Sequence, residues 1–279
     1  MTVSEAFARY DLDMLRGGNR TDKTRANYRA ALNSFIKGVG DIPIALVSLD
    51  HFSAWIQFMD SYGMQPSSQA SNISRFREVL KYLKTRGVNV IDYRDIGRPS
   101  IPRKQYTWLS YEEIGQLMDV IENGRDRAIV ASLFSTGCRI SELLSLDRAD
   151  IVGTDVIVVG KGGKQRTVYF DQRAQTALAY YLWKRKDNLS PLFVSGQYRR
   201  ITVSRVEQLL HIYSDMAGIK KNVTPHVLRH SYASDLKRNG ADLYDIKELL
   251  GHSQISTTMI YTHVNQEYNR RKHQEFHSE

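Results

Sequence analysis

The stretch TPHVLRH, residues 224–230, marks the start of a helix. Thr224 suits the N-cap position, and Pro225 is tolerated in a first helical turn, where an N–H has no partner within the helix. His226 and Arg229 then lie three residues apart on one face, near backbone amides that favour an anion. The stretch therefore predicts an anion-binding site, although this spacing alone more often belongs to a capping histidine and an arginine paired with a carboxylate.

His230 lies four residues after His226, a spacing that can also hold zinc. No catalytic glutamate follows the first histidine and no third ligand is clustered with the pair. We therefore interpret His230 as a core histidine and expect neither a metal nor a cofactor.

A second arginine, Arg139, follows residues 136–138, where a glycine ends one helix and a new helix begins. Glu142 lies three residues further on and can hold the guanidinium, as it would in a purely structural pair. Cys138 has no neighbouring histidine and is interpreted as a small buried apolar residue. As the single cysteine, it excludes an intramolecular disulfide and indicates a reducing compartment.

Two short runs rich in β-branched residues, 156–159 and 167–170, flank the sequence GKGGK at 160–164. This pattern predicts a β-hairpin. Lys161 lies at its tip, with Lys164 and Arg166 as competitors for any role there. An ordinary charged hairpin turn fits the same residues.

Tyr261 is one of 16 tyrosines, but it follows the start of a short helix and is followed by polar residues rather than by core. Its phenol has an ordinary pKa of about 10, so attack at neutral pH needs cations or a base. The sequence LGH at 250–252 adds His252 shortly before it.

The first 97 residues predict helices throughout. The predicted helices cover 4–15, a second capped by Thr24, a third beginning at Ser48 or Asp50, and a fourth at 67–86. The fourth carries five cations against one acid: Arg75, Arg77, Lys81, Lys84 and Arg86. Such charges form either a solvated face or a stripe facing phosphates.

Residues 98–107 contain two prolines and predict a linker in which Arg103 and Lys104 lie along a phosphate backbone. Ser110 and Glu113 have the capping-box spacing that starts the next helix. We thus predict a helical domain at 1–97 and a second domain at 108–279. Its later helices are expected at 172–186, 203–217, 225–239, 242–250 and 256–262.

The chain has 39 basic and 30 acidic side chains, a net charge of +9, which favours a polyanionic partner. No apolar run is long enough to cross a bilayer, and no signal peptide is evident. We expect a cytoplasmic, nucleoid-associated protein that does not contact membranes.

Four blocks occur in a characteristic order: FSTGCRISELLSL (134–146), GKGGKQR (160–166), HVLRH (226–230) and LLGHSQISTTMIYTH (249–263). Each is weak alone, but together they resemble the motifs of the tyrosine recombinases, the phage integrase family, and most of all its simple Xer-like members. The resemblance implies a mainly α fold with a small β-hairpin. A helical core-binding domain and an α+β catalytic domain would form a clamp on double-stranded DNA.

By this resemblance the chain is a site-specific recombinase that cuts and rejoins DNA as a tetramer on two sites. Arg139 and Arg229 would bind the non-bridging oxygens of the scissile phosphate, and Lys161 would protonate the leaving 5′ oxygen. His226 and His252 would assist proton handling, and Tyr261 would form a 3′-phosphotyrosyl bond. Lys164 and Arg166 would touch flanking phosphates, and a polar tail at 264–279 would contact a neighbouring protomer.

Three alternatives remain open on the sequence. A type IB topoisomerase would use a similar site to relax DNA without exchange, but the chain is small for one. A non-catalytic DNA-binding regulator is disfavoured because every catalytic position is filled. A zinc hydrolase, suggested only by the two histidines, is the third.

Overall fold

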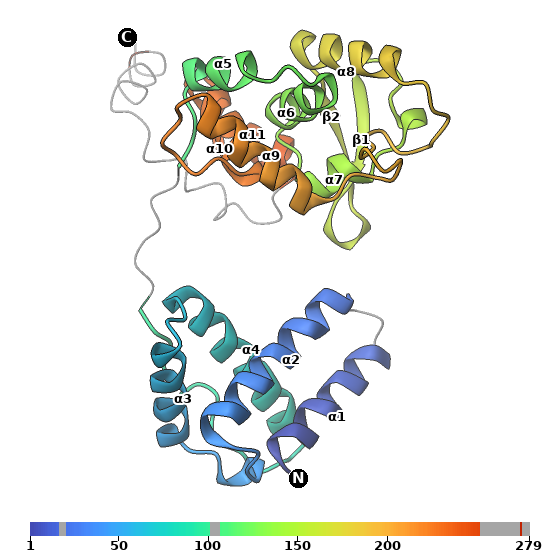
Figure 1. The fold of residues 1–279 in the computed structure, drawn as a ribbon. Coiled ribbons are helices and arrows are strands. Elements are labelled where there is room, and N and C mark those ends of the chain that lie inside the picture. The colour runs from blue at the N-terminus through green and yellow to red at the C-terminus, as the bar shows by residue number, and fades with distance from the viewer. Residues whose placement is uncertain (17–20, 101–106, 252–273, 275–279) are drawn as a thin grey trace. The chain divides into compact units, whose positions relative to one another are not determined.

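The structure, a computed structural model, describes residues 1–16, 21–100, 107–251 and 274. The chain divides into two compact units, residues 1–104 and 105–279, each with its own hydrophobic core. Figure 1 shows both. The candidate linker residues Arg103 and Lys104 lie outside the described residues. No helix in the described part of the chain is long and apolar enough to span a membrane.

The first unit is helical, as predicted. Its helices are α1 (Val3–Arg16), α2 (Asp22–Val39), α3 (Leu49–Ser61) and α4 (Pro66–Thr85), with a 3₁₀ turn, η1 (Ile44–Leu46), before α3. The prediction that Thr24 caps α2 was wrong, because the helix begins one turn earlier. Thr21 is the N-cap, and its Oγ1 accepts a hydrogen bond from the backbone N–H of Thr24 at 3.3 Å. Both threonines are suitable caps, and the earlier one begins the helix.

Aromatic side chains form the centre of this core. Phe35, Phe52, Trp55 and Phe76 are buried, with ring centroids 4.5–6.0 Å apart. Trp55 also donates a hydrogen bond from Nε1 to Ser34 Oγ at 3.0 Å, so its polar atom is satisfied. Burial of each such side chain contributes about 1.5–3 kcal/mol, which explains why the apolar faces of α2, α3 and α4 meet here.

The second unit is mainly α with one two-stranded antiparallel sheet, also as predicted. Its elements are α5 (Tyr111–Asp119), α6 (Gly124–Thr136), α7 (Ile140–Ser145), η2 (Arg148–Asp150), β1 (Asp155–Val159), η3 (Lys161–Gly163), β2 (Gln165–Tyr169), α8 (Gln172–Lys184), α9 (Val203–Met216), α10 (Pro225–Arg238) and α11 (Leu243–Leu250). The last four helices agree with prediction to within two residues at each end. The helix predicted at 256–262 lies outside the described residues.

For the central helix of this unit, α6, the sequence indicated the end at Gly137 but not the start or the extent. It contacts α5, α7, α8, α10 and β2 (Figure 1), and every residue from Ala128 to Thr136 is buried. A helix buried on all sides has no amphipathic period, so hydrophobic spacing does not reveal it. Its position matters because the turn after α6 carries Arg139.

Candidate active site

The turn between α6 and α7 holds Arg139 in place. Gly137 ends α6 in the left-handed conformation, with φ 56°, and its N–H donates to the Leu133 carbonyl at 3.1 Å. A Cβ at Gly137 would lie 2.2 Å from Cδ1 of Tyr232. Glycine is therefore required here both by its dihedral angles and by the tyrosine ring packed against it. Arg139 follows as the N-cap of α7, at a fixed place in the backbone.

Glu142 anchors Arg139 twice, and the predicted contact between them is confirmed. The backbone N–H of Arg139 donates to Glu142 Oε2 at 2.8 Å, and its Nη1 donates to Oε1 at 2.6 Å. The carboxylate is 3% exposed, whereas the arginine side chain is 35% exposed. One buried carboxylate thus orients a guanidinium that still reaches the surface.

Arg166 brings a second cation to the same carboxylate. Its Nη2 donates to Glu142 Oε2 at 2.7 Å, and its side chain is 13% exposed. The predicted place of Arg166, beside Lys164 at the hairpin tip, is wrong. It lies instead within β2, opposite Val158, with its guanidinium directed to Glu142. Sequence reasoning missed this pair because 24 residues separate its members and no local spacing relates them.

Arg139, Glu142 and Arg166 form what we call the Glu142 cluster. Burial alone would raise the pKa of Glu142, but hydrogen bonds from Arg166 and Arg139 outweigh burial and lower it to about 2. The carboxylate is therefore ionised at neutral pH. With two guanidinium groups and one carboxylate, the cluster carries one net positive charge.

Arg229 joins two turns that are far apart in the sequence. Its Nη1 donates to the carbonyl of Gly137, and its Nη2 to the carbonyl of Leu250, both at 2.7 Å. The side chain is buried in α10. Gly137 comes two residues before Arg139, and Leu250 comes two before His252. One guanidinium thus connects the backbone near both candidate residues.

His226 lies in the first turn of α10. The predicted cap is confirmed, since Thr224 Oγ1 accepts the N–H of Val227 at 3.2 Å. His226 is exposed, whereas Arg229, one turn later, is buried. His230 is half-buried. The helix thus carries its candidate imidazole on the surface and its candidate guanidinium in the interior.

The hairpin brings Gly160 close to the Glu142 cluster. A Cβ at Gly160 would lie 3.3 Å from Glu142 Oε1, and Gly160 donates its N–H to the Lys164 carbonyl at 2.7 Å. Lys161 follows at the tip and Lys164 is exposed. The side chain of Lys161, and all of His252 and Tyr261, lie outside what the structure describes.

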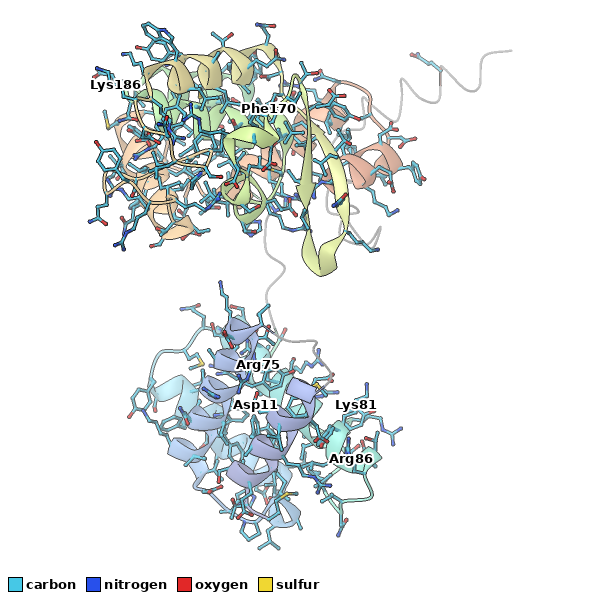
Figure 2. The ribbon with its side chains drawn as sticks, turned by 90° about the vertical axis from the view of Figure 1, so that its right-hand side faces the viewer. Asp11, Arg75, Lys81, Arg86, Phe170 and Lys186 are labelled. Carbon is cyan, nitrogen blue, oxygen red and sulfur yellow. The ribbon has the colours of Figure 1, made fainter. Side chains whose placement is uncertain are left out.

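The cations of α4 and of its C-cap mostly bind groups of their own unit. Figure 2 shows Arg75, Lys81 and Arg86 on this unit. Their contacts are Arg75 to Asn72 Oδ1 (2.9 Å), Arg77 to the Ile96 carbonyl (2.8 Å), Lys84 to Asp92 (2.5 Å) and Arg86 to Asp13 (2.8 Å). Lys81 is exposed. Arg75 also lines a shallow groove with Arg98, Ser67, Ser71 and Ser74.

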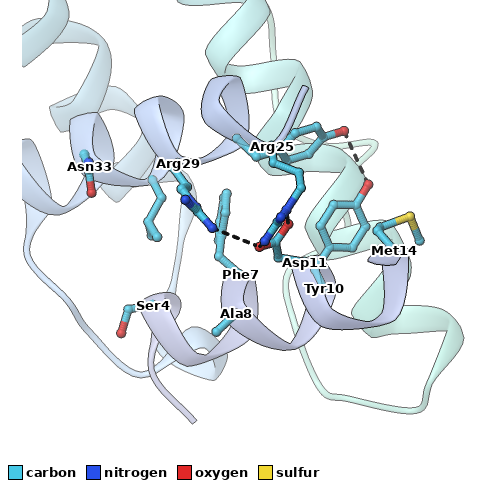
Figure 3. Close-up of a pocket in the computed structure, with 11 residues that line it drawn as sticks. Ser4, Phe7, Ala8, Tyr10, Asp11, Met14, Arg25, Arg29 and Asn33 are labelled. Carbon is cyan, nitrogen blue, oxygen red and sulfur yellow. Dashed lines mark hydrogen bonds and ion pairs between the residues drawn. The ribbon is translucent and has the colours of Figure 1, made fainter. Parts of the chain in front are cut away.

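A cavity of about 370 Å³ lies between α1 and α2 (Figure 3). On its polar side Arg25 donates two hydrogen bonds to Asp11, both at 2.8 Å, which keeps the pKa of Asp11 below its ordinary value. This pair fastens α1 to α2. Within the described ranges, no three His, Cys, Asp or Glu side chains gather as a metal site requires.

Comparison with known proteins identifies the family. The sequence pattern of the phage integrase family matches residues 107–268, more than half of the chain. The chain belongs to the phage integrase family. The tyrosine recombinase XerD of Chlorobaculum tepidum is 30% identical over 282 residues, covering 93% of this chain and 91% of XerD. The chain is therefore a tyrosine recombinase of the Xer type, and its function is site-specific DNA recombination.

Solved structures agree with the fold of this integrase. The crystal structure of XerA recombinase, 28% identical, aligns with a TM-score of 0.56 over 99% of both chains. A lambda integrase tetramer bound to a Holliday junction, 18% identical, aligns with a TM-score of 0.75 over 92% of this chain and 79% of the other. These relatives favour neither a topoisomerase nor a non-catalytic regulator.

Proposed function

We propose that this integrase cuts duplex DNA by forming a covalent 3′-phosphotyrosyl bond at Tyr261, and that Arg139 and Arg229 bind the scissile phosphate. The observation that carries the proposal is the pair of hydrogen bonds from Arg229 to the carbonyls of Gly137 and Leu250. They connect the backbone beside Arg139 with the backbone beside His252. Two motifs separated by more than 100 residues are thus held at one place.

The charges suit a phosphoryl transfer. As the tyrosine oxygen attacks, negative charge develops on the non-bridging oxygens, and fixed guanidinium donors stabilise that charge most effectively. Arg139 is held at its main chain and its side chain by Glu142, while a third of the side chain stays exposed. Such an arginine loses little freedom when it binds a phosphate.

Proton transfer completes the reaction. The oxygen of Tyr261 forms a bond to phosphorus, the bond to the 5′ oxygen breaks, and the phenolic proton is lost. Lys161 gives a proton to the leaving 5′ oxygen. His226 and His252 assist in accepting the phenolic proton of Tyr261 and help to position the phosphate. His226 is exposed at the N-terminus of α10, where backbone amides favour an anion.

Rejoining is the same reaction in reverse. A 5′ hydroxyl attacks the phosphotyrosine and releases Tyr261. Because the covalent bond keeps the energy of the broken phosphodiester, this chemistry draws on no ATP. Attack by a 5′ hydroxyl from a second site exchanges strands, whereas attack by the original one restores the substrate.

We further propose the contacts that surround this chemistry. Exposed Lys164 touches a phosphate beside the cut, Arg75 and Lys81 contact the duplex from the first unit, and Arg103 and Lys104 lie along the backbone between units. Four protomers assemble on two sites, as the lambda integrase tetramer does on its junction. The polar tail at 264–279 contacts a neighbouring protomer. The protein works at the nucleoid, where its DNA is.

The test of this proposal is a search for the covalent adduct. A nicked duplex that loses a short strand on cleavage traps the adduct, which then migrates slowly on a denaturing gel. Tyr261→Phe should abolish the adduct and leave DNA affinity nearly unchanged, because only the attacking oxygen is lost. Tyr62→Phe, at a tyrosine 76% exposed in the first unit, is the matched control and should keep the adduct. A persistent adduct in Tyr261→Phe would move the nucleophile elsewhere, with Tyr268 tested next.

A further inference from the structure

We propose that Arg166 is a positioning residue of this recombinase, which frees the charge of Arg139 for the phosphate by neutralising Glu142. The inference rests on the proposed role of Arg139. It assigns Arg166 no contact with DNA. This role is supported by the hydrogen bonds of the Glu142 cluster, in which both arginines donate to the same carboxylate.

Glu142 divides its two oxygens between the arginines. Oε1 accepts the Nη1 donor of Arg139, whereas Oε2 accepts Nη2 of Arg166 together with the Arg139 backbone N–H. The carboxylate is 3% exposed, so water screens its charge poorly. If a neutral side chain replaced Arg166, Arg139 would be the one guanidinium left in the cluster to face the buried negative charge. The cluster would then have no net charge, and Arg139 would be a weaker ligand for a phosphate.

Arg166 is also fixed by two glycines that immediately precede proposed catalytic residues. A Cβ at Gly251, just before His252, would lie 2.8 Å from Arg166 Cδ. A Cβ at Gly160, just before Lys161, would lie 3.3 Å from Glu142 Oε1 and 3.7 Å from Arg166 Nη1. The pair therefore packs beneath the backbone of both turns. A side chain at Gly251 would have to displace Arg166, and one at Gly160 would have to move Glu142 Oε1 by a few tenths of an ångström.

The guanidinium of Arg166 meets Glu142 inside the protein, whereas that of Arg139 reaches the surface. The side chain of Arg166 is 13% exposed, and its Nε is buried with no hydrogen-bond partner among the described residues. Lys164, two residues earlier, is exposed. Of these two cations, Lys164 is directed outward and Arg166 into the protein, and of the two only Arg166 meets Glu142.

The test compares two substitutions of similar length that differ in charge. Arg166→Met keeps the packing beneath Gly251 but removes the charge, whereas Arg166→Lys keeps the charge. Single-turnover cleavage of the nicked duplex, at saturating protein, measures the chemical step apart from DNA affinity. We expect Arg166→Met to be slower by at least about tenfold with unchanged affinity, and Arg166→Lys to stay within about threefold of the wild type.

A double variant gives an independent test of the role of charge. Glu142→Gln combined with Arg166→Met removes both the carboxylate charge and the guanidinium that neutralises it. The amide oxygen of the glutamine can still accept a hydrogen bond from Arg139. We expect the double variant to cleave faster than Arg166→Met alone, a non-additive result that a packing role does not produce. Arg173→Ala is the control for the loss of a positive charge. Arg173 donates a hydrogen bond to Tyr111 Oη, and this variant should cleave as fast as the wild type.

The inference would be overturned by wild-type cleavage in Arg166→Met, by equal losses in Arg166→Met and Arg166→Lys, or by a double variant no faster than Arg166→Met. A loss of DNA affinity with an unchanged cleavage rate would make Arg166 a DNA contact and would overturn it as well. Failure of the proposed function looks different, because Arg139→Ala would then cleave normally or Tyr261→Phe would keep its adduct.

Discussion

Arg229 donates a hydrogen bond from Nη1 to the carbonyl oxygen of Gly137, 92 residues earlier in the chain, at 2.7 Å. Its Nη2 makes an equal bond to the carbonyl of Leu250. A planar guanidinium spans two carbonyls in a fixed geometry that a lysine ammonium does not reproduce. This arginine therefore both organises the site and, by our proposal, binds the phosphate.

Arg229→Lys is expected to lose stability and cleavage together. At least one buried carbonyl loses its donor, so the free energy of unfolding should fall by about 1–3 kcal/mol in urea titrations. Cleavage should fall by roughly 100-fold or more, the typical loss for a donor that stabilises a transition state. Arg185→Lys is the control, because Arg185 is also buried and bonds two carbonyls, of Pro191 and Leu192, which lie outside the four motif blocks. It should lose stability but keep cleavage; the idea fails if the two variants behave alike.

Glu142→Gln should have a lower free energy of unfolding than the wild type at neutral pH. This difference between the two proteins should shrink as the pH falls. The pKa of Glu142 is lowered from an ordinary 4.5 to about 2, so the ionised form favours the folded state. Each pKa unit is worth about 1.4 kcal/mol, giving a contribution on the order of 3 kcal/mol above pH 4.5. It is lost as the pH falls from 4.5 towards 2. Urea midpoints of both proteins at pH 7, 5, 4 and 3 measure this, and a constant difference would contradict it.

Gly137→Ala should be much more damaging than Gly153→Ala. Both glycines have positive φ, 56° and 76°, and alanine in that region costs about 1–2 kcal/mol. At Gly153 the new methyl meets nothing within 4 Å, whereas at Gly137 it meets Tyr232 Cδ1 at 2.2 Å. Overpacking adds about 1–3 kcal/mol, and the displaced turn should also slow cleavage. Equal thermal midpoints for the two variants would show that the tyrosine ring yields easily.

Lys161→Ala should cleave normal DNA slowly but recover on DNA with sulfur in place of the 5′ bridging oxygen. A thiolate leaves without a proton, so the typical general-acid contribution of about 10²–10⁴-fold is no longer needed. Arg139→Ala should show no comparable recovery, because by our proposal its charge acts on the non-bridging oxygens of the phosphate. Selective rescue of Lys164→Ala instead would reassign the acid.

Deletion of residues 264–279, which fall almost wholly outside the described residues, should spare binding of one protomer to a half-site. Cooperative occupancy of a full site and recombination should both weaken, because by our proposal the tail contacts a neighbouring protomer. Gel-shift titrations on half and full sites measure this. A tail of equal length made of glycine and serine is the control for chain length, and should behave like the deletion. Wild-type cooperativity in the deletion would exclude the proposed contact.

Local contacts at fixed spacing could be predicted from the sequence. The Thr224 cap, the capping box of Ser110 and Glu113, the contact between Arg139 and Glu142, and the hairpin all join residues close in the chain. Their geometry follows from helix and strand periods, which hold wherever the element is placed. The four motif blocks likewise indicate the family by their residues and their order along the chain.

Only the tertiary structure decided which distant groups meet. The pairing of Arg166 with Glu142, the bonds of Arg229 to Gly137 and Leu250, and the burial of α6 on every side depend on how elements pack. Arg166 shows the reason. Strand alternation fixes the face on which its side chain lies, but not whether that face meets water, a phosphate or a carboxylate. Packing settles that, because a buried carboxylate is stable only where cations reach it.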